Sequence, residues 1–192
     1  MTCTDDLLGR RGVSDLEAEV KALRAEVERL KSRDEILQQI TRYGRGQEWL
    51  DPTLMDEVFY DDAHVDFGFF VGVWKDYKPM LMEIEASGET TFHLCAAPQI
   101  EFDGPDKAYA EVYGIAGGRG FDGKTNVFGG RYFDVWERRK DTWKIASRIF
   151  KLDWHIDHQF PQGEAVMHPE LEPAKPRSPE NKLFRRMGVD VT

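Results

Sequence analysis

The feature that most limits the fold is a run of long segments in the second half of the chain, in which apolar and polar residues alternate. These segments cover about residues 91–102, 107–117, 125–138 and 142–153, and Asp103-Gly104, Asp122-Gly123 and Lys140-Asp141 separate them. Alternation with a period of two is typical of strands, and short turns join antiparallel neighbours. The sequence therefore predicts a largely antiparallel sheet.

Helical patterns precede these strands. One pattern runs through Ile36, Ile40 and Tyr43 and is expected to stop around Gly44 and Gly46. Pro52 is placed to start a short helix, a strand is expected around Ala63–Phe67, and another helix over 74–84. Helices followed by antiparallel strands predict an α+β fold. We expect a cone-shaped α+β barrel, in which a curved sheet wraps over the helices.

An amphipathic helix is predicted upstream of this domain. Ser14 and Glu17 form a capping box, and an apolar stripe then repeats at spacings of four and three residues. The stripe consists of Leu16, Val20, Leu23, Val27 and Leu30. Because it lasts only about two heptads, we expect a helix laid on the domain body or on a neighbouring subunit rather than an autonomous coiled coil.

The chain divides into four parts on this basis. Residues 1–13 are expected to be disordered, 14–33 to form the amphipathic helix and 34–160 the catalytic domain. Residues 161–192 are rich in proline and charge, which predicts an extended tail.

Composition excludes several classes of protein. The 192 residues carry a formal net charge of −9, which argues against a nucleic-acid or anionic-membrane surface. No apolar run approaches the roughly 18 residues that a membrane helix needs. The acidic N-terminus does not resemble a secretory signal, and two cysteines, Cys3 and Cys95, are too few for a disulfide framework. We expect a cytoplasmic protein.

His93 is the first candidate for chemistry. It lies among apolar residues of a predicted strand, where small environmental effects can make an imidazole an acid or a base. A core histidine that binds a backbone carbonyl would give the same pattern, so the strand alone does not decide between these readings.

Two further segments carry a family resemblance. Residues 61–68 read Asp-Asp-Ala-His-Val-Asp-Phe-Gly, residues 129–139 read Gly-Gly-Arg-Tyr-Phe-Asp-Val-Trp-Glu-Arg-Arg, and residues 143–148 read Trp-Lys-Ile-Ala-Ser-Arg. Together they resemble the first strand and the closing hairpin of the SnoaL-like branch of the nuclear-transport-factor-2-like superfamily. This branch includes scytalone dehydratase, and the resemblance covers roughly residues 34–155.

The resemblance implies site residues and a reaction class. In the hexachlorocyclohexane dehydrochlorinase pattern, the base histidine matches His93, an arginine matches Arg148, and Glu48 stands where that pattern has an aspartate. In the bile-acid dehydratase pattern a tyrosine matches Tyr43, but the catalytic aspartate falls on Ala116, so that triad is not carried over. The implied activity is cofactor-independent elimination. A deformylating lyase of lignin-derived diaryl compounds, an isomerase and a non-catalytic ligand-binding module are the alternatives.

The residue chemistry suits elimination. His93 would be the base, Glu48 would hold its other ring nitrogen, and Arg148 would stabilise an anion. Tyr43 and Tyr113 could protonate a leaving hydroxyl, or be core aromatics. Glu48 could instead be a solvated helix-end residue, and Arg148 could form a structural ion pair with Glu48 or Asp66.

The expected ligand is a small apolar molecule. Twelve Phe, six Tyr and five Trp favour a bulky or aromatic substrate, although a cone of this size needs aromatic filling in any case. The candidate substrate-binding residues are Tyr113, Asp66, Phe67, Trp74, Asn126 and Tyr132. His64 and Asp66 share one strand face, for which the outer face of the sheet is favoured.

No metal or cofactor is predicted. The cluster His155-Ile156-Asp157-His158, with His168 nearby, has no recognised ligand spacing for a strand end or loop. Residues 118–123 match GxGxxG, but they separate two strands and therefore predict a hairpin. Apolar residues on both faces of residues 127–136 predict a homo-oligomer, a dimer or a trimer.

Overall fold

The computed structural model describes residues 13–159. The tails expected over 1–13 and 161–192 therefore lie outside the described residues, apart from Val13. None of the helices within 13–159 is both long enough and apolar enough to cross a membrane.

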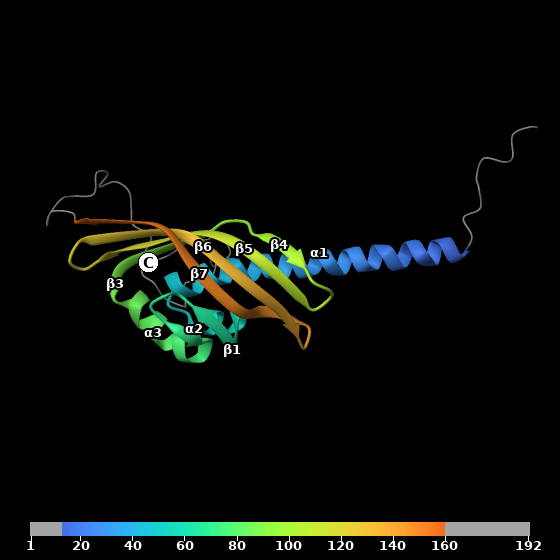
Figure 1. Cartoon of the computed structure of the whole chain (residues 1–192), viewed down its shortest axis with the longest axis horizontal. Helices are drawn as coiled ribbons and strands as arrows, with labels where there is room; N and C mark the ends of the chain where they lie inside the picture. The colour runs from blue at the N-terminus through green and yellow to red at the C-terminus, as the bar shows by residue number, and fades with distance from the viewer. Residues whose placement is uncertain (1–12, 160–192) are drawn as a thin grey trace, which may run out of the picture.

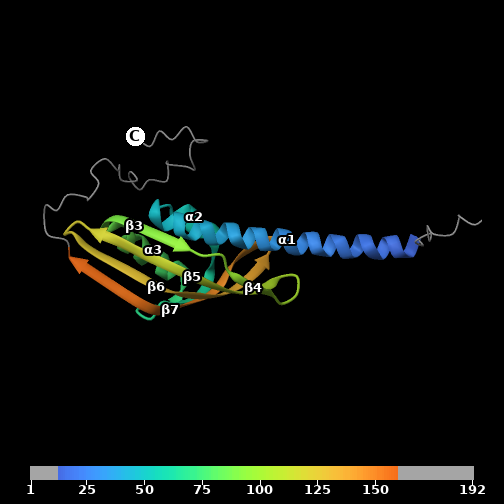
Figure 2. The same cartoon turned by 90° about the horizontal axis from the view of Figure 1, so that it is seen from above.

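Helix α1 (Val13–Glu48) is a single 36-residue helix. The predicted end at Gly44 and Gly46 is wrong by about one turn, since the helix continues to Glu48. Its first half projects away from the body of the molecule (Figures 1 and 2), and the residues of the apolar stripe are 45–59% exposed. Of the two expected positions for this helix, the domain body is therefore wrong and a neighbouring subunit stays a prediction. Ser32, at 7% exposure, marks where the helix meets the body.

Helix α2 (Pro52–Val58) begins as the sequence predicts. Pro52 occupies its first turn, and the Asp51 carboxylate accepts hydrogen bonds from the Thr53 and Leu54 amides at 3.0 and 3.2 Å. This cap satisfies two amides that a helix start leaves without intrahelical partners. Strands β1 (Phe59–Asp66) and β2 (Val71–Val73) follow, and helix α3 (Trp74–Ala86) comes next.

The rest of the described chain is sheet. It comprises β3 (Gly88–Cys95), β4 (Gln99–Phe102), β5 (Lys107–Gly120), β6 (Lys124–Arg139) and β7 (Thr142–Gln159). The sheet order is β2-β1-β7-β6-β5-β3, with β4 on β5, and only the β1–β7 pairing is parallel among the described strands. The α+β class and the curved sheet are as predicted (Figure 2).

The strand boundaries differ from the prediction most clearly in residues 91–102 and at the end of β7. The segment expected as one strand over 91–102 is two strands, because the chain leaves the sheet between Cys95 and Gln99, where Pro98 has no amide hydrogen to donate. Strand β7 continues beyond the predicted end at residue 153 to Gln159, and His155 and His158 lie at this strand end, which is one of the two places expected for them.

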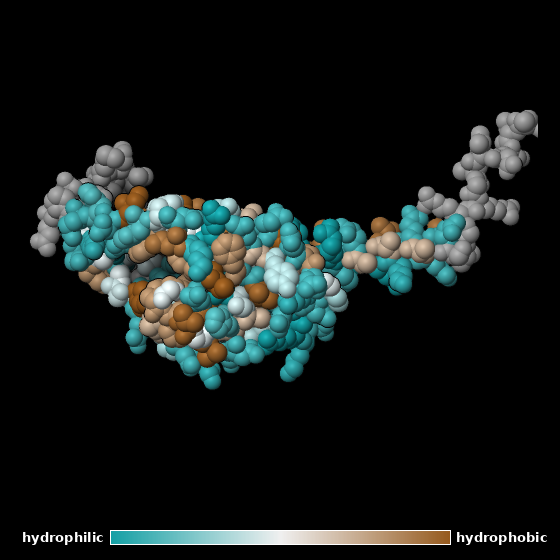
Figure 3. Space-filling view, viewed as in Figure 1, coloured by the Kyte–Doolittle hydropathy of each residue, from teal (hydrophilic) through white to brown (hydrophobic). Residues whose placement is uncertain are grey.

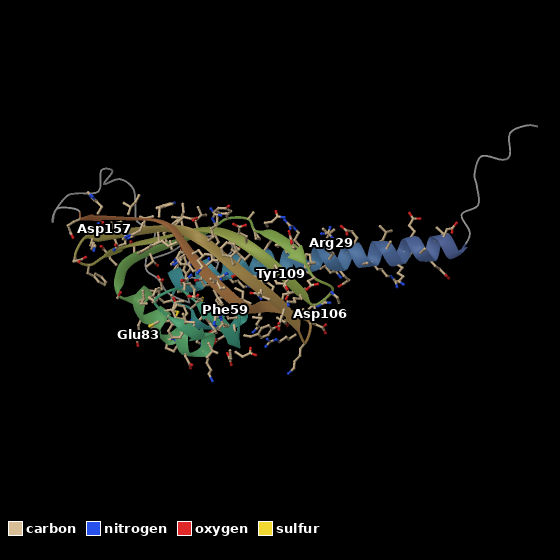
Figure 4. All side chains as sticks on the ribbon, in the orientation of Figure 1. Arg29, Phe59, Glu83, Asp106, Tyr109 and Asp157 are labelled. Carbon is tan, nitrogen blue, oxygen red and sulfur yellow. The ribbon has the colours of Figure 1, made fainter. Side chains whose placement is uncertain are left out.

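The core lies between the concave face of the sheet and the helices. Along β6, Tyr132, Asp134 and Trp136 are buried, while Phe133 on the opposite face is 42% exposed. Phe59 stacks on Trp74 at a centroid distance of 3.8 Å in this core, and Figure 4 shows Phe59 within the body. The inner face of the sheet is thus the surface on which buried functional groups can gather.

Candidate active site

His93 faces the interior from β3. Alternation along the strand points Thr91, His93 and Cys95 inward, while Phe92 and Leu94 are 59% and 52% exposed on the outer face. The His93 side chain is only 7% exposed. Its inward direction, which the sequence left open, is the first condition for a role as an interior base.

Helix α1 approaches this strand closely because it carries a glycine there. A Cβ atom at Gly44 would lie 3.2 Å from the His93 carbonyl oxygen and 3.3 Å from its Cβ. Such contacts are tighter than ordinary van der Waals packing, so a larger residue would push the helix from the strand. Gly44 was expected to end the helix. It instead lies within the helix and allows α1 to pack closely against His93.

Two carboxylates reach His93 by different routes. Glu85 places Oε1 at 3.5 Å from the His93 Nε2 atom, and its side chain is 9% exposed. Glu48 accepts a hydrogen bond from the His93 backbone amide. The sequence assigned the ring contact to Glu48, so this contact is corrected: Glu85 lies at the ring, and Glu48 holds the main chain of the same residue.

Glu85 was missed by sequence reasoning, although a signal was present. The buried residues of α3 are Trp74, Tyr77, Leu81 and Glu85. Their spacings of three, four and four residues describe one helix face, so Glu85 continues an apolar stripe. A carboxylate in such a stripe needs a buried partner, because burial of a lone charge is costly.

Arg148 is fully buried and paired with Asp134. The two residues lie opposite each other on β7 and β6, and the guanidinium donates to both carboxylate oxygens at 2.7 Å. The side chains are 1% and 0% exposed. The structural ion pair that the sequence offered as an alternative for Arg148 is present, but its carboxylate is Asp134 rather than Glu48 or Asp66. The alternation of Tyr132, Asp134 and Trp136 on β6 was the signal for Asp134.

Aromatic rings surround this ion pair. The Arg148 Cζ atom lies 4.2 Å from the ring centre of Tyr43, 4.3 Å from that of Tyr132 and 5.3 Å from that of Phe59. Such cation–π contacts stabilise a desolvated guanidinium. Within residues 13–159, Arg148 Nη1 has no hydrogen-bond partner, although it is buried. This nitrogen is therefore a donor that an anionic or carbonyl oxygen could satisfy.

Burial keeps the neighbouring acids protonated. Desolvation raises the pKa of Tyr43 to about 12 against the opposing charge of Arg148, and it raises the pKa of Cys95 to about 11. The pKa of Tyr132 is also raised well above its usual value by burial. Desolvation lowers the pKa of Arg148, but the charge and hydrogen bonds of Asp134 outweigh it, so the net shift is upward. At neutral pH the site holds neutral phenols beside a cation.

His93, Glu85, Tyr43, Arg148 and Asp134 form one group of interior side chains, which we call the buried cluster. Tyr43 contacts Arg148, the charge of Glu85 acts on the Tyr43 pKa, and the next residue, Gly44, packs on His93. A histidine with a carboxylate at its ring, a neutral phenol and a buried guanidinium can together accept a proton, donate one and stabilise an anion.

The other predicted residues lie in different places. Tyr132 is one of the aromatic residues around Arg148, and Trp74 is fully buried at 0% exposure. Phe67 stacks on Tyr77 with 4.7 Å between the ring centroids. These residues fill the core, which is the alternative that composition left open. The Asp66 carboxylate accepts from the Gly68 amide at 2.8 Å, so it stabilises a turn.

Two of the predicted substrate-binding residues, Tyr113 and Asn126, lie away from the interior. Tyr113 is 52% exposed on the outer face, where the Arg131 guanidinium lies 4.7 Å from its ring centre, because its strand register turns it away from the interior. Asn126 lies near the open end of the β6–β7 ladder, with Oδ1 at 3.4 Å from His155 Nε2. Neither residue adjoins the buried cluster, and the exposed His64 on β1 is outside, as favoured.

His155, Asp157 and His158, the residues of the rival metal cluster that the structure describes, lie at the end of β7. The His155 ring stacks on Phe128 at 4.4 Å, and His168 lies outside the described residues. Among residues 13–159, no group of three or more His, Cys, Asp or Glu side chains is arranged to hold a metal ion.

Solved structures share this fold. A hexachlorocyclohexane dehydrochlorinase, LinA-type3, from Novosphingobium barchaimii is 17% identical, covers 71% of this chain and 98% of its own, and gives a TM-score of 0.63. A scytalone dehydratase-like protein from Novosphingobium aromaticivorans is 21% identical, with coverage of 73% and 99% and a TM-score of 0.64. A nuclear-transport-factor-2-like protein from Salmonella enterica is 21% identical, with coverage of 70% and 96% and a TM-score of 0.58.

Sequence comparison agrees with the fold. None of the curated proteins matches this chain in sequence. The model of the SnoaL-like domain matches residues 28–149, which is more than half of the chain and includes every member of the buried cluster. On this match, together with the cone-shaped fold, the chain belongs to the family of SnoaL-like domains.

Proposed function

We propose that the protein is a lyase that eliminates water or a halide from a small, largely apolar molecule, without a metal or redox cofactor. The observation that carries the proposal is the buried contact of Glu85 with the His93 ring, in the same interior as Arg148 Nη1, a buried donor that has no hydrogen-bond partner within residues 13–159. Elimination needs a base at the carbon acid and a stabiliser for the negative charge, and these groups supply both.

The geometry suggests how the base is prepared. Glu85 lies at His93 Nε2, so a proton on this nitrogen is favoured and Nδ1 is left as the basic atom. Nδ1 takes a proton from carbon, the electrons of the C–H bond form a double bond, and the leaving group departs with its bonding pair. Glu85 then stabilises the imidazolium that has formed.

Tyr43 and Arg148 would act on the leaving group. Tyr43 is a neutral phenol because its pKa is raised to about 12, so it can give its proton to a departing hydroxide. Arg148 Nη1 can donate to an oxygen that gains negative charge, while Asp134 holds the rest of the guanidinium in place. Glu48 takes a positioning role, since it fixes the strand that carries His93.

The names of two structural relatives support this reaction class. One is a dehydrochlorinase and the other a scytalone dehydratase-like protein, and both names denote an elimination, of hydrogen chloride or of water. The aromatic rings that border Arg148 support a largely apolar substrate, and an aromatic or polycyclic compound is the class that we propose.

The test begins with a ligand. Thermal unfolding is measured in the presence of aromatic, steroid and lignin-derived compounds, since a ligand that binds only the folded state raises its stability. Each compound that raises the melting temperature is then incubated with the protein, with and without EDTA. The masses of the products are measured by mass spectrometry. We expect loss of water or halide at an unchanged rate in EDTA.

Other products would identify the alternatives. Loss of a one-carbon aldehyde would indicate a deformylating lyase that uses the same base, and a product of unchanged mass would indicate an isomerase. Ligand binding without turnover would favour a non-catalytic binding module. Turnover that EDTA abolishes and one divalent metal restores would replace the proposal with a metalloenzyme.

A further inference from the structure

The first half of α1 carries an apolar stripe that the protein's own body leaves open. We call residues 16–31 the projecting helix. Its stripe residues are half-exposed, from 45% at Val20 to 59% at Leu23. Figure 3 shows apolar side chains among polar ones along this helix, well clear of the globular body. Five apolar residues on one face of a solvated helix call for a partner.

The spacing of the stripe specifies the partner's geometry. Leu16, Leu23 and Leu30 fall at the d positions of a heptad, and Val20 and Val27 fall at the a positions. β-Branched residues at a with leucine at d favour two parallel helices. The stripe covers 15 residues, or about 22 Å of helix.

The flanking charges identify the partner as a second copy of this chain. The g positions hold Glu19 and Glu26, and the e positions that follow five residues later hold Arg24 and Lys31. In a parallel pair, each g residue faces the e residue five positions on in the other helix, so both contacts are attractive. In an antiparallel pair, g residues face g residues, which would bring Glu19 and Glu26 together.

The ion pairs within the projecting helix do not prevent its charged residues from pairing with a second helix. Glu26 pairs with Arg29 at 2.6 Å, and Lys31 pairs with Glu28 at 2.9 Å, but all four side chains are more than half exposed. Exposed pairs of this kind contribute little, so their exchange for contacts between helices costs little.

We propose that the projecting helices of two copies of this chain form a short, parallel, in-register coiled coil. Because α1 runs unbroken from this segment to Glu48, the coiled coil is built on the same helix that positions His93. The two domains are then held side by side, with their N-terminal helices pointing the same way.

Cysteine cross-linking of the full chain tests the register. In a Cys3→Ser background, Leu16→Cys or Leu30→Cys places each thiol opposite its own copy, while the matched control Ala25→Cys lies on the opposite helix face. We expect mild oxidation to join both stripe variants into covalent dimers, and the control to stay single. Cross-linking of the control to the same extent would overturn the proposal. So would cross-links that form only when the Leu16 and Leu30 variants are mixed.

Charge exchange tests the partner. Arg24→Glu alone, or Glu19→Arg alone, places like charges at the g–e contacts and should weaken self-association by about tenfold at low salt. The double variant Glu19→Arg/Arg24→Glu restores opposite charges and should recover the wild-type affinity, as should a mixture of the two single variants. Dissociation constants from sedimentation measure this. An unrescued double variant, or single variants that associate as tightly as wild type, would contradict a parallel coiled coil.

Discussion

Glu85 and Glu48 both reach His93, but they act on different parts of it. Glu85 contacts the ring and Glu48 contacts the main-chain amide. Replacement of each carboxylate by an amide of the same shape therefore separates the chemistry of the residue from its placement.

Glu85→Gln should lower kcat by about 10- to 100-fold, because the amide cannot stabilise the imidazolium as a carboxylate does. Glu48→Gln should have a smaller effect on kcat, but it should lower the free energy of unfolding by about 1–2 kcal/mol, because a charge-assisted hydrogen bond to the backbone becomes a neutral one. Steady-state kinetics and urea unfolding measure the two effects. Equal losses of kcat in both variants would contradict the assigned roles.

Tyr43 gives a pH dependence of stability with a defined sign. Its pKa is about 12 in the folded protein and about 10 in the unfolded chain, so the folded state holds the proton more tightly. The contribution is complete below pH 10 and is lost between pH 10 and 12, at about 1.4 kcal/mol per pH unit for one group.

The substitution Tyr43→Phe removes this proton. The stability of the variant should therefore fall less steeply than that of the wild type between pH 10 and 12, in urea unfolding at each pH. The exposed Tyr113→Phe variant is the matched control and should follow the wild type. Parallel curves for all three proteins would show that burial does not hold the Tyr43 proton.

At the scale of elements, the inner face of the β6–β7 ladder carries a buried ion pair in an aromatic cage. Asp134→Asn would leave the Arg148 charge buried without its counter-charge, which should lower the free energy of unfolding by about 3–5 kcal/mol. Asp153→Asn is the control, because Asp153 pairs with Arg131 on the exposed face and should change stability by less than about 1 kcal/mol. Similar losses in both variants would contradict the role of burial.

The same elements show how far the sequence predicts this fold. Alternation and turn pairs predict the strands of the sheet, and helical spacing predicts α2 and α3, because these signals are local. Whether His93 faces inward depends on the register of β3 against β5 and on the close approach at Gly44, which are long-range contacts. A single sequence does not encode such contacts in a form that can be read directly.

The candidate site follows the same division. His93, Arg148 and Tyr43 were predicted, since the family resemblance placed them, and the structure buries all three. Glu85 and Asp134 were missed, because each is a carboxylate in an otherwise apolar stripe and needs its partner's position before it becomes meaningful. The helix and strand periodicities contain both residues, but periodicity alone does not indicate which buried cation or ring a carboxylate will meet.

At the scale of the whole molecule, the outer face of the sheet is apolar and open. A hollow of about 320 Å³ on this face is lined by Tyr109, Phe133, Val135 and Ile149, among others, and Figure 4 shows Tyr109 on the sheet. Phe133 and Tyr109 are each 42% exposed. We expect this face to contact another subunit, in addition to the contact that the projecting helix provides.

Light scattering of the full chain at micromolar concentration should therefore give a mass above that of one chain. Phe133→Asp should lower this mass, because it places a charge in the apolar face. The control Phe121→Asp, at a turn residue that is 78% exposed and lies off the sheet face, should leave the mass unchanged. A wild-type mass of a single chain would contradict the expected assembly.

The central claim is that His93 is the base of an elimination, and turnover of a ligand found by thermal shift tests it most directly. His93→Gln should reduce turnover by about 100-fold or more while the melting temperature stays close to that of the wild type. His64→Gln, which changes an exposed histidine on the outer face of β1, should turn over as the wild type does. A His93→Gln protein that is folded and turns over at the wild-type rate would contradict the claim.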